Sequence, residues 1–152
     1  MKLSEHFALA EFTRSESAKR HGVSNDPTPE HLQNLINLCE KVLEPIRIKF
    51  GPINISSGYR SKALNHYIGG SLNSQHCEAK AADIDQDGMG GASNTEIFNY
   101  IKDNLDFDQM IWEFGDNNKP DWVHVSYNGA KNRKQVLRAL KVNGKTAYAP
   151  YK

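Results

Sequence analysis

Residues 74–83 hold side chains that could bind a metal ion. His76 leaves a polar loop, and Asp83 follows seven residues later inside a small, apolar strand pattern, Ala-Ala-Asp-Ile. An unpaired carboxylate in such a strand would cost several kcal/mol, so Asp83 needs a cation or strong hydrogen-bond donors. Zinc supplies that compensation, because histidine and aspartate are among its ordinary ligands.

A second histidine lies in the segment Asp-Trp-Val-His-Val-Ser. Alternation along a strand places His124 on the same face as Trp122 and Ser126. Joined to His76 and Asp83, it would complete the three-ligand set of a catalytic zinc site, which leaves one position open for water. Zinc lowers the pKa of such a water from about 15.7 to roughly 7.

Two charged residues could perform hydrolytic chemistry at such a centre. Asp121 stands three residues before His124, and as a general base in reach of the water it would contribute about 10²–10⁴-fold. Arg60 follows a glycine turn, and its planar fork of donors could stabilise an oxyanion or bind the terminal carboxylate of a peptide. Taken singly, each site residue has a plainer explanation, such as a surface histidine, a paired carboxylate or a solvated charge. Their combination at these spacings favours a metal-assisted hydrolase.

The composition fits one globular domain over residues 1–152, large enough to bury a core. The net charge is +1 and the basic residues are spread along the chain, which argues against a nucleic-acid partner, because nucleic-acid binding uses a concentrated basic stripe. No apolar run reaches the roughly 18–20 residues of a membrane span. The N-terminus lacks the apolar core of a signal peptide. We therefore expect a monomer that is made in the cytoplasm and has no membrane partner.

One long helix is the best-determined of the elements that must position these side chains. Apolar residues recur at three- and four-residue steps over residues 29–49, with Thr28 as N-cap, Pro29 at the first helical position and Pro45 near the end. Further expected elements are a helix within 7–21, helices at 61–68 and 94–103, and strands at 53–56, 81–85, 109–114 and 122–127. An Asn-Gly pair at 143–144 predicts a C-terminal β-hairpin.

Helices followed by strands predict an α+β fold, an antiparallel sheet with flanking helices. We expect the metal on the open face of the sheet, with the long helix behind it. Of the two cysteines, Cys39 is expected to be a buried helical thiol. A disulfide to Cys77 is disfavoured in a reducing compartment, and Cys77 is not expected as a metal ligand, because neighbours such as His76 and Cys77 seldom converge on one ion.

The motifs around Arg60, His76, Asp83 and His124 together resemble the zinc D-alanyl-D-alanine carboxypeptidase family, over nearly the whole chain. That family shares the hedgehog signalling-domain fold and includes phage endolysins. The resemblance implies a Zn²⁺ cofactor held by the two histidines and the aspartate. It also implies Asp121 as catalytic base and Arg60 as the group that stabilises the transition state.

Three further residues are interpreted beside this resemblance. Ser74 matches a serine that contacts substrate in some relatives. Glu113, in Trp-Glu-Phe, could form a hydrogen bond to a ligand histidine or a salt bridge at a strand end. Relatives commonly carry glycine where this chain has Ala79, and if that position needs a positive φ, alanine costs about 1 kcal/mol.

The function implied is a zinc metallopeptidase that hydrolyses peptidoglycan stem peptides by removing terminal D-alanine. Cleavage between L-alanine and D-glutamate, as in some endolysins of the family, is the alternative within the enzyme class. A zinc-bearing binding module without catalysis is the rival from another class, and the carboxylate of Asp121 argues against it; a structural virion component is a further rival. Without a signal peptide, a cell-wall enzyme would need phage-mediated release or a place in a virion, whereas a recycling enzyme could stay in a bacterial cytoplasm.

Overall fold

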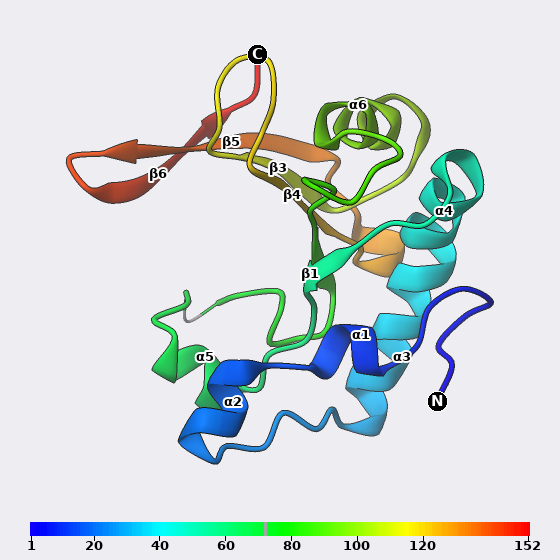
Figure 1. Ribbon diagram of the computed structural model, residues 1–152, viewed down its shortest axis with the longest axis vertical. Coiled ribbons are helices and arrows are strands. Elements are labelled where there is room, and N and C mark those ends of the chain that lie inside the picture. The colour runs from blue at the N-terminus through cyan, green and yellow to red at the C-terminus, as the bar shows by residue number, and fades with distance from the viewer. Residues whose placement is uncertain (72) are drawn as a thin grey trace.

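The computed structural model describes residues 1–71 and 73–152 (Figure 1). Most of its helices precede its strands, which is the order that the sequence predicted. The helices are α1 (Ala10–Thr13), α2 (Glu16–His21), α3 (Pro29–Leu38), a π-helical segment η1 (Cys39–Leu43), α4 (Glu44–Phe50), α5 (Lys62–Tyr67), α6 (Asn94–Asn104) and a 3₁₀ turn η2 (Gly129–Lys131). None of the helices in these ranges is long and apolar enough to cross a membrane.

The long helix predicted over residues 29–49 is confirmed as the continuous run α3–η1–α4. It begins at a capping box, in which the Thr28 hydroxyl accepts a hydrogen bond from the His31 backbone N–H at 3.2 Å. Its middle widens into a π-turn just before Pro45. Because proline has no N–H and its ring crowds the preceding turn, this widening accommodates Pro45 without breaking the helix.

The N-terminal segment forms two short helices where one was predicted within residues 7–21. Arg14 adopts an extended conformation after α1. The Ser15 hydroxyl then accepts a hydrogen bond from the Ala18 backbone N–H and begins α2 as its N-cap. Gly22, at a φ of 63°, ends α2 in the left-handed conformation.

The six-stranded sheet has the order β1-β2-β4-β3-β5-β6. The strands are β1 (Ile55–Ser57), β2 (Ala81–Ile84), β3 (Gln109–Glu113), β4 (Trp122–Ser126), β5 (Gln135–Val142) and β6 (Lys145–Pro150). The α+β class is confirmed. The expectation of a wholly antiparallel sheet is wrong, because β3 and β5 pair in parallel. Residues 127–134 connect β4 to β5 and pass the end of β3. The chain reverses along this connection, so β5 runs antiparallel to β4 and therefore in the same direction as β3.

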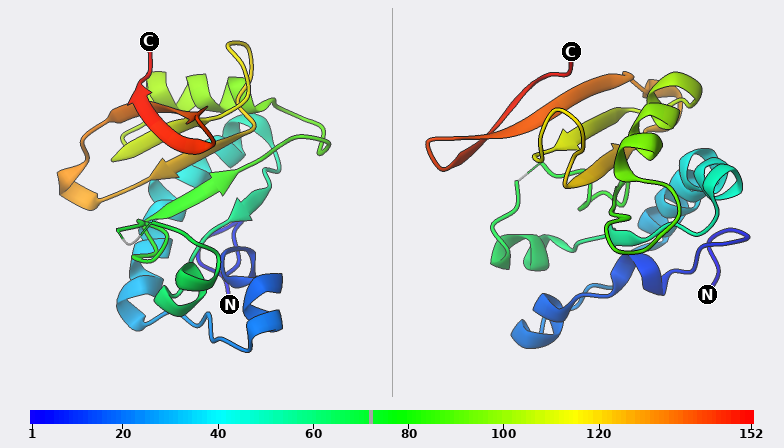
Figure 2. Two further views of the ribbon diagram at one scale, coloured as in Figure 1. Left: turned by 90° about the vertical axis from the view of Figure 1, so that its left-hand side faces the viewer. Right: turned by 45° about the horizontal axis from the view of Figure 1, so that its top comes forward.

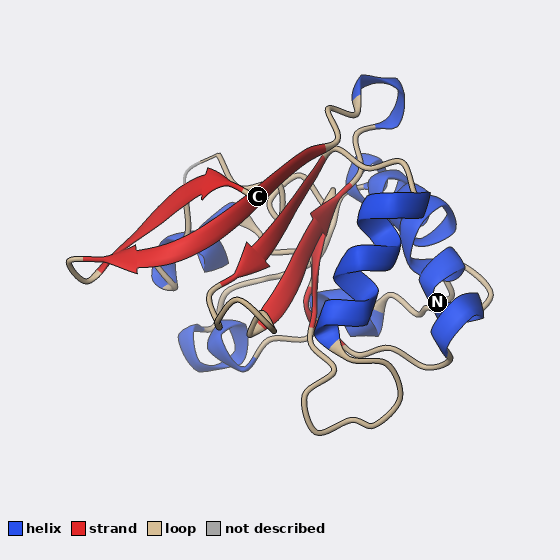
Figure 3. Cartoon of the chain, turned by 90° about the horizontal axis from the view of Figure 1, so that it is seen from above, coloured by secondary structure: helices blue, strands red, loops and turns tan. Residues whose placement is uncertain are grey.

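Helices α3, α4 and α6 cover one face of the sheet. Figure 1 shows α3, α4 and α6 on one side of the strands, and the left view of Figure 2 shows the sheet with the long helix behind it. Side chains between these layers form the core, among them Leu35, Leu43, Ile84, Phe98 and Val123. From above, the hairpin of β5 and β6 extends away from these helices (Figure 3). It turns at Asn143 and Gly144, both at positive φ, as the Asn-Gly pair predicted.

Candidate metal centre and its cleft

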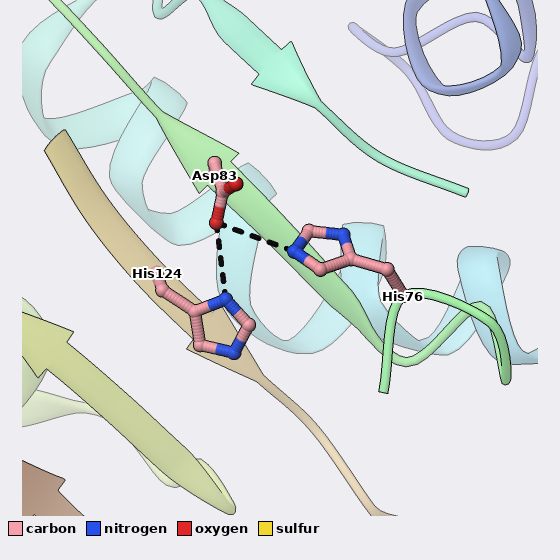
Figure 4. A group of neighbouring side chains, drawn as sticks. All are labelled: His76, Asp83 and His124. Atoms are coloured by element: carbon pink, nitrogen blue, oxygen red, sulfur yellow. Dashed lines mark hydrogen bonds and ion pairs between the residues drawn. The ribbon is translucent and has the colours of Figure 1, made fainter. Parts of the chain in front are cut away.

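Two of the three predicted ligands stand side by side on neighbouring strands. Asp83 of β2 is paired with His124 of β4 in the antiparallel register, so their side chains lie on the same face of the sheet. Nδ1 of His124 lies 3.0 Å from Oδ1 of Asp83 (Figure 4). The strand alternation that predicted the orientation of His124 is therefore confirmed.

The third predicted ligand, His76, reaches this pair from the loop before β2. Its Nδ1 lies 2.6 Å from the backbone carbonyl of Gly58, to which it can donate a hydrogen bond. That bond leaves Nε2 facing Oδ1 of Asp83, 3.4 Å away (Figure 4). One donor atom from each of the three side chains lies within 4.8 Å of the others. The structure thus brings together residues that are 48 positions apart in sequence, from 76 to 124.

This donor set fits a zinc ion. Ligand atoms about 2.0–2.2 Å from a tetrahedral zinc stand about 3.3–3.6 Å apart, and the distances of 3.0 and 3.4 Å are close to that spacing. Burial disfavours the charged form of Asp83. The positive charge of His76 and hydrogen bonds from His124 and His76 nevertheless hold the pKa of this carboxyl well below its usual range. His76, Asp83 and His124 could therefore hold a divalent cation.

A cleft of about 730 Å³ opens over this group. The loop between β1 and β2 contributes Arg60 and Ser74 to its lining. Nη2 of Arg60 lies 3.3 Å from the Ser74 hydroxyl, which also accepts a hydrogen bond from the His76 backbone N–H at 3.2 Å. Nε of Arg60 is buried and has no hydrogen-bond partner within the described residues. Both residues predicted to meet the substrate are thus at the cleft.

The cleft contains a second carboxylate besides Asp83, that of Glu113, which is buried. Glu113 is paired with Trp122 in the sheet, so its side chain lies on the same face as His124. Its carboxylate makes neither of the interactions expected from sequence, the hydrogen bond to a ligand histidine or the salt bridge, with any residue that the structure describes. Burial, with a smaller contribution from the charge of Asp83, raises the pKa of Glu113 to about 7 against the opposing effect of His124.

Asp121, predicted as the base, does not line the cleft. It is exposed and precedes β4, where its backbone N–H donates to the carbonyl of Glu113 at 2.8 Å and its own carbonyl accepts from the Asn94 side chain at 3.0 Å. One feature of the sequence could have identified Glu113 as a site residue. Its carboxylate lies within the apolar run Met-Ile-Trp-Glu-Phe, at the end of the strand that pairs with β4.

Cys39 is buried in the core, as predicted, and burial raises the pKa of its thiol to about 12. Cys77 is also a free thiol. It lines a second cavity of about 420 Å³, which meets the metal cleft at Asn73 and Ser74 because these two residues line both. The two cavities therefore adjoin across the loop that carries His76.

A comparison with protein families identifies a relationship for most of the chain. The sequence model of a family described as Peptidase M15 matches residues 5–126, which include all three predicted metal ligands. A search of the curated proteins gave no match.

Proposed function

The chain belongs to the M15 peptidase family, whose members are zinc metallopeptidases, and from this premise we propose a zinc-dependent hydrolase of peptidoglycan stem peptides with D-Ala-D-Ala carboxypeptidase activity. The observation that carries the proposal is the meeting of His76, Asp83 and His124 at the floor of a cleft that also holds Arg60 and Glu113. Two imidazoles and one carboxylate are the ligand chemistry of a catalytic zinc site.

Zinc, when bound, would act as a Lewis acid that polarises the scissile carbonyl and acidifies a water. Glu113 then has the properties of the general base. Its carboxylate lies in the cleft beside the ligands, and a pKa of about 7 allows it both to accept a proton from water and to return it to the leaving amine. Asp121 does not line the cleft, so we assign the base to Glu113 in its place.

Arg60 is suited to bind negative charge in the substrate. No carboxylate within the described residues forms an ion pair with its guanidinium, which Ser74 holds on the loop side of the cleft. The N–H donors of the planar guanidinium can therefore bind the oxyanion that develops during amide hydrolysis, or the terminal carboxylate of the peptide. A cation free to bind a terminal carboxylate favours carboxypeptidase activity.

Endopeptidase activity between L-alanine and D-glutamate is the second candidate, and one observation favours it. The polar cavity lined by Cys77, Glu78 and Lys80 continues the cleft past Ser74. A substrate that occupied both cavities would extend beyond the metal on both sides, as the substrate of an endopeptidase does.

A muropeptide digest tests these proposals. Purified protein with one equivalent of zinc is incubated with pentapeptide muropeptides, and the masses of the products are measured by mass spectrometry. Loss of a single alanine supports carboxypeptidase activity, whereas release of a peptide that begins with D-glutamate supports endopeptidase activity. EDTA should abolish either reaction and added zinc should restore it. A zinc-loaded protein that binds muropeptides and cleaves none would instead be a binding module.

A further inference from the structure

The C-terminal hairpin forms a wall of the metal cleft, although β5 and β6 lie outside residues 5–126, the part of the chain that the family model matches. Figure 1 shows the hairpin at the upper left and the segment that carries α5 below it. The cleft between them is lined by Leu137 and Tyr148 from the hairpin and by Arg60 and Ser74 from the opposite side. A substrate over the metal ligands would therefore lie between the two walls.

A row of paired residues runs across three strands from Glu113 to the hairpin. Glu113 of β3 is paired with Ala139 of β5, and Ala139 is paired with Tyr148 of β6. Directly paired residues point their side chains to the same face of a sheet, so all three point toward the cleft. Ala139 is fully buried between them, whereas Glu113 and Tyr148 both line the cleft.

Tyr148 has the properties of a ligand-binding residue. The residue is 57% exposed although it lines the cleft, and its hydroxyl has no hydrogen-bond partner within the described residues. Partial burial, and then the negative charges of Glu113 and Asp83, raise the pKa of this phenol, which places it within electrostatic reach of the site. Tyrosine offers a rigid ring for apolar contact and a hydroxyl for an amide, at a small cost in conformational entropy.

We propose that Tyr148 is a substrate-binding residue, which holds the stem peptide from the hairpin side of the cleft, opposite Arg60 and Ser74. The ring packs against the peptide and the hydroxyl forms a hydrogen bond with a backbone amide. This role rests on the proposed function, because it concerns the same site. Tyr148 would contribute to substrate specificity from a part of the chain that the family match does not include.

The test compares kcat and KM of the zinc-loaded full chain on a pentapeptide muropeptide. Tyr148→Ala removes contacts that the substrate makes equally in the ground and transition states. It should raise KM about tenfold and leave kcat within about twofold. Tyr148→Phe keeps the ring and should raise KM about threefold. Val142→Ala, which changes an exposed residue on the opposite face of the hairpin, should match the wild type.

Unchanged KM values for both Tyr148 variants would overturn the proposal. A fall in kcat with unchanged KM would also overturn it, because it would show a structural or chemical role. Melting temperature and zinc content are measured for every variant; if Tyr148→Ala is unstable, Tyr148→Phe still tests the hydroxyl. A wild-type protein that cleaves no muropeptide would contradict the proposed function itself, whereas an active wild type with insensitive Tyr148 variants would contradict only this inference.

Discussion

The backbone carbonyl of Gly58 lies 2.6 Å from Nδ1 of His76. A ligand histidine oriented in this way has its other nitrogen fixed toward the metal, and such bonds commonly change metal affinity by about 10- to 100-fold. Gly58 is itself held against α1, because a Cβ at this position would lie 2.6 Å from Cα of Phe12. Close packing of α1 on the end of β1 thus sets the position of the carbonyl that orients His76.

Gly58→Ala should therefore weaken both folding and metal binding. Overpacking against Phe12 typically costs about 1–3 kcal/mol, and we expect urea unfolding to show a loss in that range. A shift of the carbonyl should lower zinc affinity about tenfold in competition with a chelating dye. Gly129→Ala is the matched control, since it introduces strain at a φ of +62° with no neighbour within 4 Å. An equal loss of zinc affinity in both variants would contradict the role of Gly58.

Zinc should stabilise the folded chain, because a preformed donor set binds the ion in the native state only. At a free zinc concentration 100 times the Kd, the gain is about 2.7 kcal/mol, which corresponds to a rise in melting temperature of about 5–10 °C for a chain of this size. His76→Ala should abolish the rise, whereas His66→Ala, which changes an exposed histidine on α5, should retain it. Calorimetry with and without zinc measures the effect, and a full rise in His76→Ala would place the ion elsewhere.

An ion pair between the buried Asp108 and the half-exposed Arg133 predicts an acid-dependent loss of stability. The Asp108 carboxylate accepts hydrogen bonds from Arg133 at 2.9 Å and from the Gln75 side chain at 2.8 Å. Against the opposing effect of burial, these bonds and the charge of Arg133 lower the pKa of Asp108. A lowered pKa in the folded state gives stability that is present above the ordinary value of about 4. That stability is lost as the pH falls through the folded-state pKa.

Asp108→Asn should accordingly destabilise the protein by about 1–2 kcal/mol at pH 7, an amount reduced by the solvent exposure of Arg133. The difference from the wild type should shrink as the pH is lowered below 4. Urea unfolding of both proteins at pH 7 and pH 3 provides the comparison. A difference of the same size at the two pH values would show that the charge of Asp108 is not the cause.

Ala79 has a φ of 61° and is fully buried. This is the conformation for which the sequence predicted a cost, because alanine in the left-handed region is disfavoured by about 1–2 kcal/mol. Ala79→Gly removes that strain and loses a buried methyl worth about 0.8 kcal/mol. We expect a net gain in the free energy of unfolding of up to about 1 kcal/mol. A loss of more than 1 kcal/mol in chemical denaturation would instead show that packing of the methyl dominates.

Patterns local in sequence predicted most of the fold. Apolar periodicity and the Thr28 cap predicted the long helix, and alternation around His124 predicted both its strand and its orientation. The parallel pairing of β3 with β5 could not be predicted in this way, because it depends on the path of residues 127–134 across the end of β3. Periodicity is the same for a strand in either direction.

The three side chains predicted as metal ligands do meet in space, whereas the predicted base, Asp121, does not line the cleft. Spacing along the chain singled out Asp121, whereas the cross-strand register of β3 and β4 brings Glu113 to the cleft. Pairing between strands is a tertiary property, so a residue 11 positions before His124 can be nearer to the chemistry than one three positions before it.

The assignment of the base leads to the sharpest functional prediction. Glu113→Gln keeps the shape of the side chain and removes its ability to accept a proton, so kcat should fall about 10²–10⁴-fold while zinc content is unchanged. Asp121→Ala should retain kcat within about threefold, because its side chain is outside the cleft. The two variants are compared in the same muropeptide assay, with zinc measured by elemental analysis. Full activity in Glu113→Gln, together with loss in Asp121→Ala, would return the base to Asp121.

The pH profile gives an independent measure of the same group. Glu113 must be deprotonated to accept a proton, so activity should fall on the acid side as its carboxylate becomes protonated. Its pKa is about 7 in the metal-free protein, and a bound cation favours the charged form, so the acid limb of kcat/KM should lie below pH 7. The residual activity of Glu113→Gln should not fall on the acid side of the profile. If the acid limb of kcat/KM were unchanged in this variant, another group would be responsible for the proton transfer.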